Sequence, residues 1–170
     1  FRTTLRPYLE RLNYELEETV HLGMLDGPMV RVIDSLESPK AVRLASRLGR
    51  SLPASCSSMG KAMLAQLSTV ELHAALPNEK LEVLTPQSIR TRTELEIELA
   101  LIRKRGFATG HNESEAEVRS VAIALPIESA PARLSIGVGG PSSRISAATQ
   151  RKFGKALLAL ADEAAGALLG

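Results

Sequence analysis

The sequence has very few aromatic side chains and only one cysteine. Three Phe, two Tyr and no Trp make up 3% of the 170 residues. This scarcity disfavours proteins that bind RNA or single-stranded DNA by stacking bases on aromatic rings. The single cysteine, Cys56, excludes an internal disulfide and favours a cytoplasmic location. The core must therefore be built from Leu, Ile, Val and Ala.

An excess of charge of one sign and long apolar runs are also lacking. There are 21 Lys and Arg residues against 19 Asp and Glu, a formal net charge of +2, and 44% of the chain is hydrophobic. This mixture is typical of one globular domain and excludes a disordered tail or a strongly basic nucleic-acid binder. No run approaches the roughly 18 apolar residues of a membrane span, so we expect no membrane partner.

Hydrophobic periodicity predicts the order helix, three strands, three helices, three strands, helix. Asp26-Gly27 is a hairpin signal, and capping boxes begin at Ser68 and Thr91. Clustered strands joined by hairpins favour an antiparallel α+β domain. A turn is expected at 128–131. Pro7 would lie in the first turn of the first helix. The predicted helices are 6–19, 57–67, 69–76, 92–105 and 147–169. The predicted strands are 20–25, 29–35, 41–45, 107–111, 118–127 and 133–139.

Small hydroxyl-bearing residues stand where a loop is predicted to enter the helix at 57–67. A helix N-terminus has unpaired N–H groups and a partial positive charge, so it can bind a carboxylate or a phosphate. The simpler interpretation is that Ser57 or Ser58 only caps the helix. Both interpretations stay open at this point.

Nucleophilic catalysis is the alternative from a different class. Ser58 and Lys61 match the S-x-x-K motif of serine acyl-enzymes, but the companion motifs are absent. Cys56 could act as a nucleophile with His73 or His111, although no signature joins them. A small serine or cysteine hydrolase is therefore kept as the alternative to a non-enzymatic domain. The scattered His and Cys residues lack metal-ligand spacing, so no metal or cofactor is expected.

Alternation along two late strands predicts a sheet face with unusually small side chains. Ser120, Ala122 and Ala124 share that face in one strand, and Ser135, Gly137 and Gly139 share it in the next. Either a helix packs closely on this face, or the free volume is a ligand cavity next to the helix that starts near Ser57.

Several segments together resemble the C-terminal effector-binding domain of IclR-family bacterial transcription regulators. The resemblance covers essentially the whole chain. It is carried, in chain order, by Gly49-Arg50 with Leu52-Pro53, Gly60-Lys61-Ala62-Met63-Leu64-Ala65, Leu84-Thr85-Pro86 with Ile89, Arg103-Lys104-Arg105-Gly106-Phe107-Ala108 after Leu95 and Leu99, Glu113 with Arg119-Ser120-Val121-Ala122 and Pro126, and Ser135-Ile136-Gly137-Val138-Gly139-Gly140-Pro141.

The resemblance implies an α+β, GAF-like (profilin-like) antiparallel sheet of about six strands flanked by helices. Residues 1–20 would be a linker and first helix, and 21–170 the ligand-sensing domain. The family's N-terminal winged helix-turn-helix domain is absent from this chain, so operator DNA would be contacted only through that missing domain. A homodimer or tetramer and a small-molecule carboxylate effector are the implied partners, and no enzymatic activity is implied.

The effector pocket implied by the resemblance lies at the start of the helix near Ser57. Relatives that bind very small keto acids tend to carry an acidic residue at the position of Gly110, and Ser or Cys where Gly137 and Gly139 stand. We therefore expect a larger cavity here and an aromatic or other larger organic acid. The implied pocket residues are Leu44, Leu52, Ser57, Ser58, Met59, Gly60, Gly110, Ser120, Gly137 and Gly139.

Overall fold

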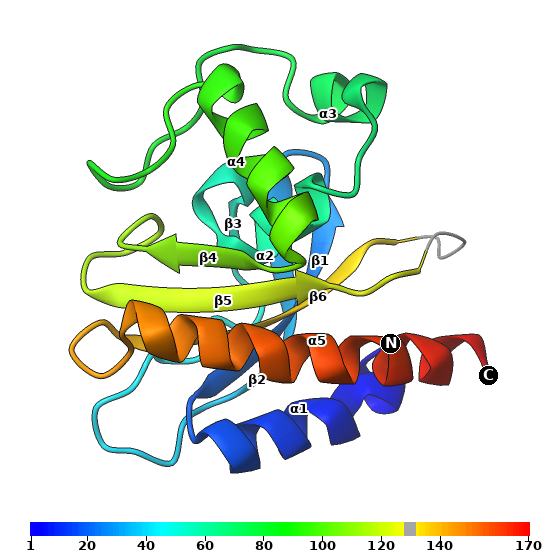
Figure 1. Cartoon of the computed structure of the whole chain (residues 1–170), viewed down its shortest axis with the longest axis vertical. Helices are drawn as coiled ribbons and strands as arrows, with labels where there is room; N and C mark the ends of the chain where they lie inside the picture. The colour runs from blue at the N-terminus through cyan, green and yellow to red at the C-terminus, as the bar shows by residue number, and fades with distance from the viewer. Residues whose placement is uncertain (128–131) are drawn as a thin grey trace.

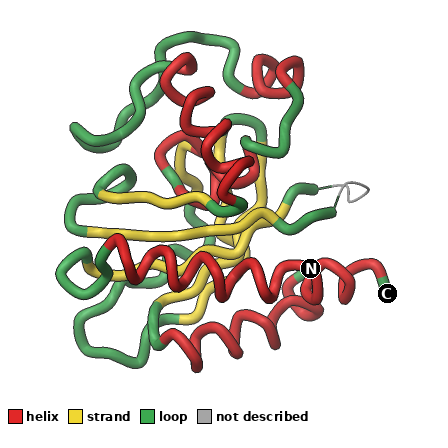
Figure 2. The backbone as a smooth tube through the Cα atoms, in the orientation of Figure 1, coloured by secondary structure: helices red, strands yellow, loops and turns green. Residues whose placement is uncertain are grey.

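A six-stranded antiparallel sheet forms the centre of the computed structural model, which describes residues 1–127 and 132–170. Figures 1 and 2 show helices on both faces of this sheet. The predicted fold class is confirmed. The strands, in their order across the sheet, are β3 (Ser51–Pro53), β2 (Met29–Leu36), β1 (Thr19–Asp26), β6 (Leu134–Pro141), β5 (Val118–Ala124) and β4 (Ala108–His111).

Two layers of helices cover the sheet. The long helices α1 (Arg2–Leu16) and α5 (Ala147–Leu169) lie side by side on one face (Figure 1). On the other face lie η1 (Ala54–Cys56) and α2 (Ser58–Leu64), with α4 (Arg92–Arg105) packed on α2 and α3 (Thr69–Ala75) farther from the sheet (Figure 1). The predicted order of element types is confirmed, although the third strand is β3 and the short helix η1 was not predicted. No helix in the described residues is both long and apolar enough to cross a bilayer.

The two sheet faces differ in side-chain size as the alternation predicts. Val121, Ile123 and Ile136 belong to the core cluster that contains the buried residues of α1 and α5. Ala108 and Ala122 belong to a second cluster, which includes Met59 and Met63 of α2. The small side chains let α2 approach the sheet closely, and this places the start of α2 over Gly137.

Local signals place several element ends correctly. Ser68 and Glu71 form the expected capping box at α3, and the Thr91 hydroxyl accepts the Glu94 N–H at the start of α4. Gly106, with φ of 94°, ends α4 in the left-handed conformation that glycine tolerates. Gly27, with φ of 57°, completes the β1–β2 hairpin.

Two predicted elements differ from the structure. The first helix begins at Arg2, so Pro7 lies inside it rather than in its first turn, and the buried Leu5, Leu9 and Leu12 hold the helix on the sheet. The predicted strand at 41–45 is wrong, because this segment is an irregular loop with Val42 66% exposed. The edge of β2 pairs instead with β3, after Gly49 turns the chain at φ of 80°. The turn predicted at 128–131 lies outside the described residues.

Candidate functional site

A small cavity lies between the start of α2, the small-residue face of the sheet and the loop that precedes β3. Seven of the ten implied pocket residues line it, and they come from segments distant in sequence. The seven are Leu44, Ser57, Ser58, Met59, Ser120, Gly137 and Gly139; the other lining residues are His21, Arg47, Ser114, Val118 and Val138.

Strand register explains why these residues meet. In the β5–β6 ladder Ser120 lies opposite Gly139, and in the β1–β6 ladder His21 lies opposite Gly137. Directly opposed residues point to the same face of a sheet. The floor of the cavity is therefore two glycine backbones flanked by a hydroxyl and an imidazole.

The expectation of a larger open cavity is wrong for this structure. A Cβ atom added to Gly137 would lie 2.7 Å from Met59 Cγ, and one added to Gly139 would lie 2.9 Å from Leu44 Cδ2. The two long side chains therefore occupy the volume that the glycines leave free. About 20 Å³ remains, which is room for about one water molecule.

The start of α2 combines capping with an unused hydroxyl. Ser57 Oγ accepts the Gly60 N–H at 3.4 Å, so the interpretation of Ser57 as a capping residue is confirmed. Ser58 is 6% exposed, and its hydroxyl makes no hydrogen bond with the described residues. A hydroxyl that lines a cavity and has no protein partner is available to a ligand.

His21 is a lining residue that the sequence analysis missed. Its Nε2 accepts the Arg47 backbone N–H at 3.3 Å. Burial and, to a lesser degree, the nearby charge of Arg47 together lower the pKa of His21 to about 3. The imidazole is therefore neutral near pH 7 and carries its proton on Nδ1, because a backbone N–H can only donate. Nδ1–H has no acceptor among the described residues, so it is a second unused donor.

Arg47 is another lining residue that the sequence analysis missed, and it supplies positive charge. Its side chain is 9% exposed, and its guanidinium contacts Glu115 Oε2 at 2.9 Å and Ser114 Oγ at 3.5 Å. Glu115 is 59% exposed and so well hydrated. The neutral His21 adds no second cation, and the cavity offers one buried guanidinium that suits a carboxylate.

Alternation could have indicated His21, since it stands between the core residues Val20 and Leu22. That pattern puts His21 on the opposite face, but only the strand order places it beside Gly137. No local signal indicates Arg47, because it lies in an irregular loop.

Three implied pocket residues do not line the cavity. Leu52 is 6% exposed and belongs to the core cluster around α2. A Cβ atom on Gly60 would lie 2.2 Å from the Ala54 carbonyl oxygen, so Gly60 permits close packing of α2 on η1. A Cβ atom on Gly110 would lie 2.8 Å from Ser120 Oγ, so Gly110 stands behind the lining hydroxyl.

Lys61 and Cys56, which were considered for nucleophilic catalysis, make other contacts. Lys61 Nζ donates to the Thr109 carbonyl at 2.7 Å and to Glu113 Oε1 at 2.8 Å. Cys56 Sγ contacts the Glu82 carbonyl oxygen at 3.4 Å. Across the described ranges, no hydrogen bond joins Ser58 to Lys61 or Cys56 to a histidine, as an activated nucleophile would need. Those ranges also contain no group of three or more His, Cys, Asp or Glu residues placed to hold a metal ion.

Sequence comparison finds one family model, described as the bacterial transcriptional regulator IclR C-terminal domain, over residues 1–165. The chain is 34% identical over 122 residues to the HTH-type transcriptional regulator XynR of Escherichia coli, covering 72% of the chain and 48% of that protein. It is 30% identical over 161 residues to the Transcriptional repressor IclR of Escherichia coli, covering 94% of the chain and 59% of that protein. The chain thus spans about half to three-fifths of these two relatives.

Comparison with solved structures also finds IclR-type regulators. The Thermotoga maritima IclR crystal structure matches with a TM-score of 0.89 and 26% identity, over 97% of this chain and 67% of that one. The Agobacterium tumefaciens repressor BlcR matches with a TM-score of 0.86 and 26% identity, over 98% of this chain and 66% of that one.

Proposed function

This chain belongs to the IclR family of bacterial transcriptional regulators as a C-terminal effector-binding domain, and from that premise we propose that its α2 cavity binds a small organic acid. Binding would modulate the operator affinity of a regulator whose DNA-binding domain precedes this domain. In this proposal residues 1–20 are the linker and first helix, residues 21–170 are the sensor, and the protein acts in the cytoplasm without catalytic activity.

The meeting of two unused hydrogen-bond donors at one cavity is the observation that carries the proposal. Ser58 Oγ and His21 Nδ1 have no hydrogen-bond partner in the described part of the chain, and the buried Arg47 guanidinium stands beside them. A carboxylate accepts several hydrogen bonds and carries the charge that Arg47 complements. A neutral ligand would use the hydroxyl and the imidazole but not the guanidinium charge.

The effector is proposed to be an aromatic or other larger acid. Gly137 and Gly139 leave a wide floor, and Met59 and Leu44 now cover it. Met is unbranched and adapts readily to new surroundings, and Leu44 lies on the irregular loop before β3. Displacing these two side chains opens the cavity over the glycines. The cost of displacing them is offset by new apolar contact with the ligand.

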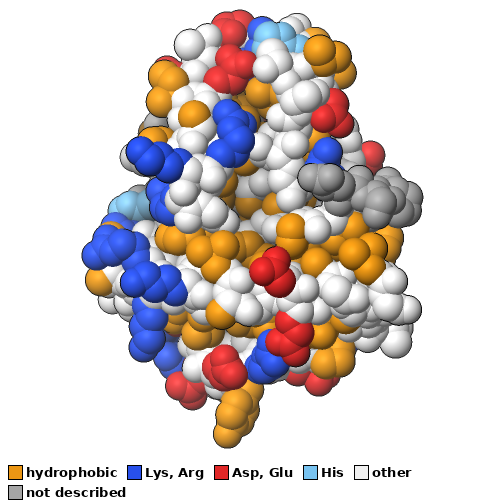
Figure 3. Space-filling model, turned by 45° about the vertical axis from the view of Figure 1, so that its right-hand side comes forward, with side chains coloured by type: hydrophobic (Ala, Val, Ile, Leu, Met, Phe, Trp, Pro, Cys, Tyr) orange, Lys and Arg blue, Asp and Glu red, His pale blue; other side chains and the backbone are white. Residues whose placement is uncertain are grey.

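Regulation requires that the effector bind two arrangements of the regulator with different affinity. A coupling of about 1–3 kcal/mol changes DNA affinity roughly five- to 150-fold. We propose a homodimer or tetramer as the assembly that responds, with α1 as one contact surface, since Tyr14 on α1 is 85% exposed. On the face in Figure 3, hydrophobic side chains form a band across the middle, between charged groups of both signs.

The proposal is tested by placing a negative charge in the cavity. Ser58→Glu puts a carboxylate where the acid's carboxylate would bind, so we expect at least a tenfold loss of benzoate affinity in titration calorimetry. Ser58→Ala removes one hydrogen bond and should weaken binding about two- to tenfold.

The matched control is Ser143→Glu, because Ser143 is exposed in the turn after β6. It should leave the benzoate affinity unchanged. Circular dichroism checks that each variant is folded. If both Ser58 variants bind benzoate as tightly as the parent chain, the acid does not bind in this cavity.

A further inference from the structure

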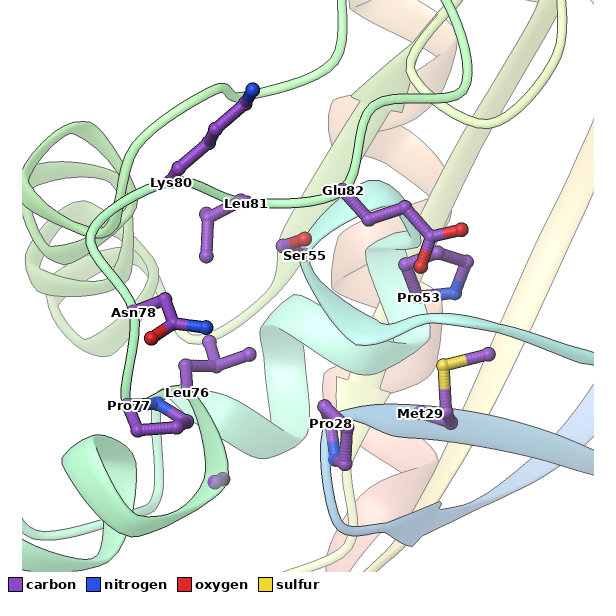
Figure 4. Close-up of a pocket in the computed structure, with 11 residues that line it drawn as sticks. Pro28, Met29, Pro53, Ser55, Leu76, Pro77, Asn78, Lys80, Leu81 and Glu82 are labelled. Atoms are coloured by element: carbon purple, nitrogen blue, oxygen red, sulfur yellow. The ribbon is translucent and has the colours of Figure 1, made fainter.

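A second cavity lies at the β2–β3 edge of the sheet, between η1 and the chain that follows α3. It shares no lining residue with the α2 cavity and has a volume of about 210 Å³. Figure 4 shows its lining side chains arranged around an open centre. A cavity of about 150 Å³ can hold benzene, so this one has room for a ring with a small substituent.

The walls are mostly apolar and combine buried with exposed residues. Leu76 is 8% exposed and Leu81 is 6% exposed, and Pro28, Met29, Pro53, Ala75 and Pro77 complete the apolar lining. Such walls, with a few polar groups, are typical of small-molecule sites.

Of the polar residues that line this cavity, Ser55 is the buried one. Ser55 is 2% exposed, and its hydroxyl makes no hydrogen bond with the described residues. Figure 4 places Ser55 between Leu81 and Pro53 at the cavity. Its hydroxyl can both donate and accept. A ligand atom with hydrogen-bonding capacity would therefore be recognised at this point.

The charge at the cavity rim balances. Lys80 and Glu82 contribute one cation and one anion to the lining. This cavity therefore favours neither an acid nor an amine, whereas the α2 cavity contains a buried guanidinium. The chemistry fits a neutral compound.

We propose that this cavity is a second small-molecule site, which takes a neutral single-ring compound whose hydroxyl or amide group bonds to Ser55. It is independent of the proposed acid site, because the two cavities have different lining residues, and only the α2 cavity has a lining that favours an anion. The regulator would then respond to two chemical classes through one domain.

The test is a phenol titration followed by ¹H–¹⁵N correlation spectra. We expect saturable shifts centred on Met29, Ser55, Leu76 and Leu81. Ser55→Ala should weaken phenol binding about two- to tenfold, which is the loss of one neutral hydrogen bond. Toluene binding should not change in the same variant, because toluene has no group to bond to Ser55.

Three further variants distinguish a site from a structural effect. Ala75→Leu adds volume to the lining and should abolish binding of both probes. Ser143→Ala, at an exposed serine, should leave both affinities unchanged. Ser58→Glu should also leave phenol binding unchanged, so failure of the acid proposal and failure of this one give different results.

Phenol shifts that never saturate, or that disappear in Ser58→Glu, would overturn the proposal. So would phenol affinity that is equal in the parent chain, Ser55→Ala and Ala75→Leu. In the absence of phenol, chemical-shift changes at Met29, Ser55, Leu76 and Leu81 that grow with protein concentration would show that a second copy covers the cavity. This result would also overturn the proposal.

Discussion

Gly60 and Gly166 are both helical glycines, but their surroundings differ. A Cβ atom on Gly60 would lie 2.2 Å from the Ala54 carbonyl oxygen, a backbone atom that cannot move aside alone. Gly166 in α5 has nothing within 4 Å of its Cβ position. We expect Gly60→Ala to lower the free energy of unfolding by about 3 kcal/mol.

Gly166→Ala is the matched control and should raise the free energy of unfolding by about 0.5–1 kcal/mol through helix propensity. Urea unfolding of both variants measures the two effects. Equal stability of Gly60→Ala and the parent chain would show that α2 does not pack on η1 as described.

His21 should make the domain lose stability in mild acid. Burial holds the pKa of folded His21 at about 3, against an ordinary value of 6.5. Between pH 6.5 and pH 3 His21 is protonated in the unfolded state but neutral in the folded state. The free energy of unfolding therefore falls as the pH drops through this range. The loss is about 2 kcal/mol between pH 7 and pH 5. Urea unfolding at both pH values measures it.

The variant to compare is His21→Gln, in which the loss of unfolding free energy between pH 7 and pH 5 should vanish. His73→Gln is the control, because the His73 side chain is 44% exposed. An unchanged pH dependence in His21→Gln would mean that His21 is not buried as a neutral group.

The site could be predicted residue by residue only where a motif, an alternation or the family resemblance marks it. Ser58, Met59, Ser120 and the two floor glycines are in that class. Met59 also shows what sequence cannot supply, because it fills the space over Gly137 that the glycine seemed to leave empty. The volume of a cavity depends on rotamers of distant residues, and a strand pattern does not contain them.

At the scale of elements, one buried lysine ties α2 to β4 and α4. Lys61 is 1% exposed, and its ammonium contacts Thr109, Glu113 and, at 3.7 Å, Glu98. Removing one partner of a buried ion pair leaves an uncompensated charge. We expect Glu113→Gln to lower the free energy of unfolding by about 3 kcal/mol.

The double variant Lys61→Met with Glu113→Gln should be more stable than Glu113→Gln alone, because it removes the unpaired charge. Glu117→Gln is the control in the same loop, since Glu117 is exposed, and should change stability by less than about 0.5 kcal/mol. Urea unfolding of these variants and of the single variant Lys61→Met measures the coupling. Simple addition of the two single effects would contradict a buried pair.

Elements with local signals were predictable, and the one that depends on distant pairing was not. Capping by Ser68 and Thr91 needs only residues within one turn. The segment 41–45 has strand-like residues, but β2 has one free edge, and β3 takes it. The displaced segment instead carries Leu44 and leads to Arg47 at the cavity.

At the scale of the whole molecule, the two faces of the sheet have different roles, one in the core and one in the candidate site. The bulky face binds α1 and α5 into the main core, and the small-residue face supports α2 and the cavity. Alternation and the family resemblance predicted this division. The strand order, with β1 between β2 and β6, brings His21 to Gly137 and could not be read from local patterns.

The central claim is that the α2 cavity binds an organic acid, and a thermal-shift screen tests it most directly. The parent chain and Ser58→Glu are heated with a panel of keto acids and aromatic acids at millimolar concentration. An acid present at 100 times its dissociation constant should stabilise the parent chain by roughly 2.7 kcal/mol. That corresponds to about 5–10 °C in Tm, and Ser58→Glu should show no shift. No shift with any acid, or equal shifts in both proteins, would contradict the claim.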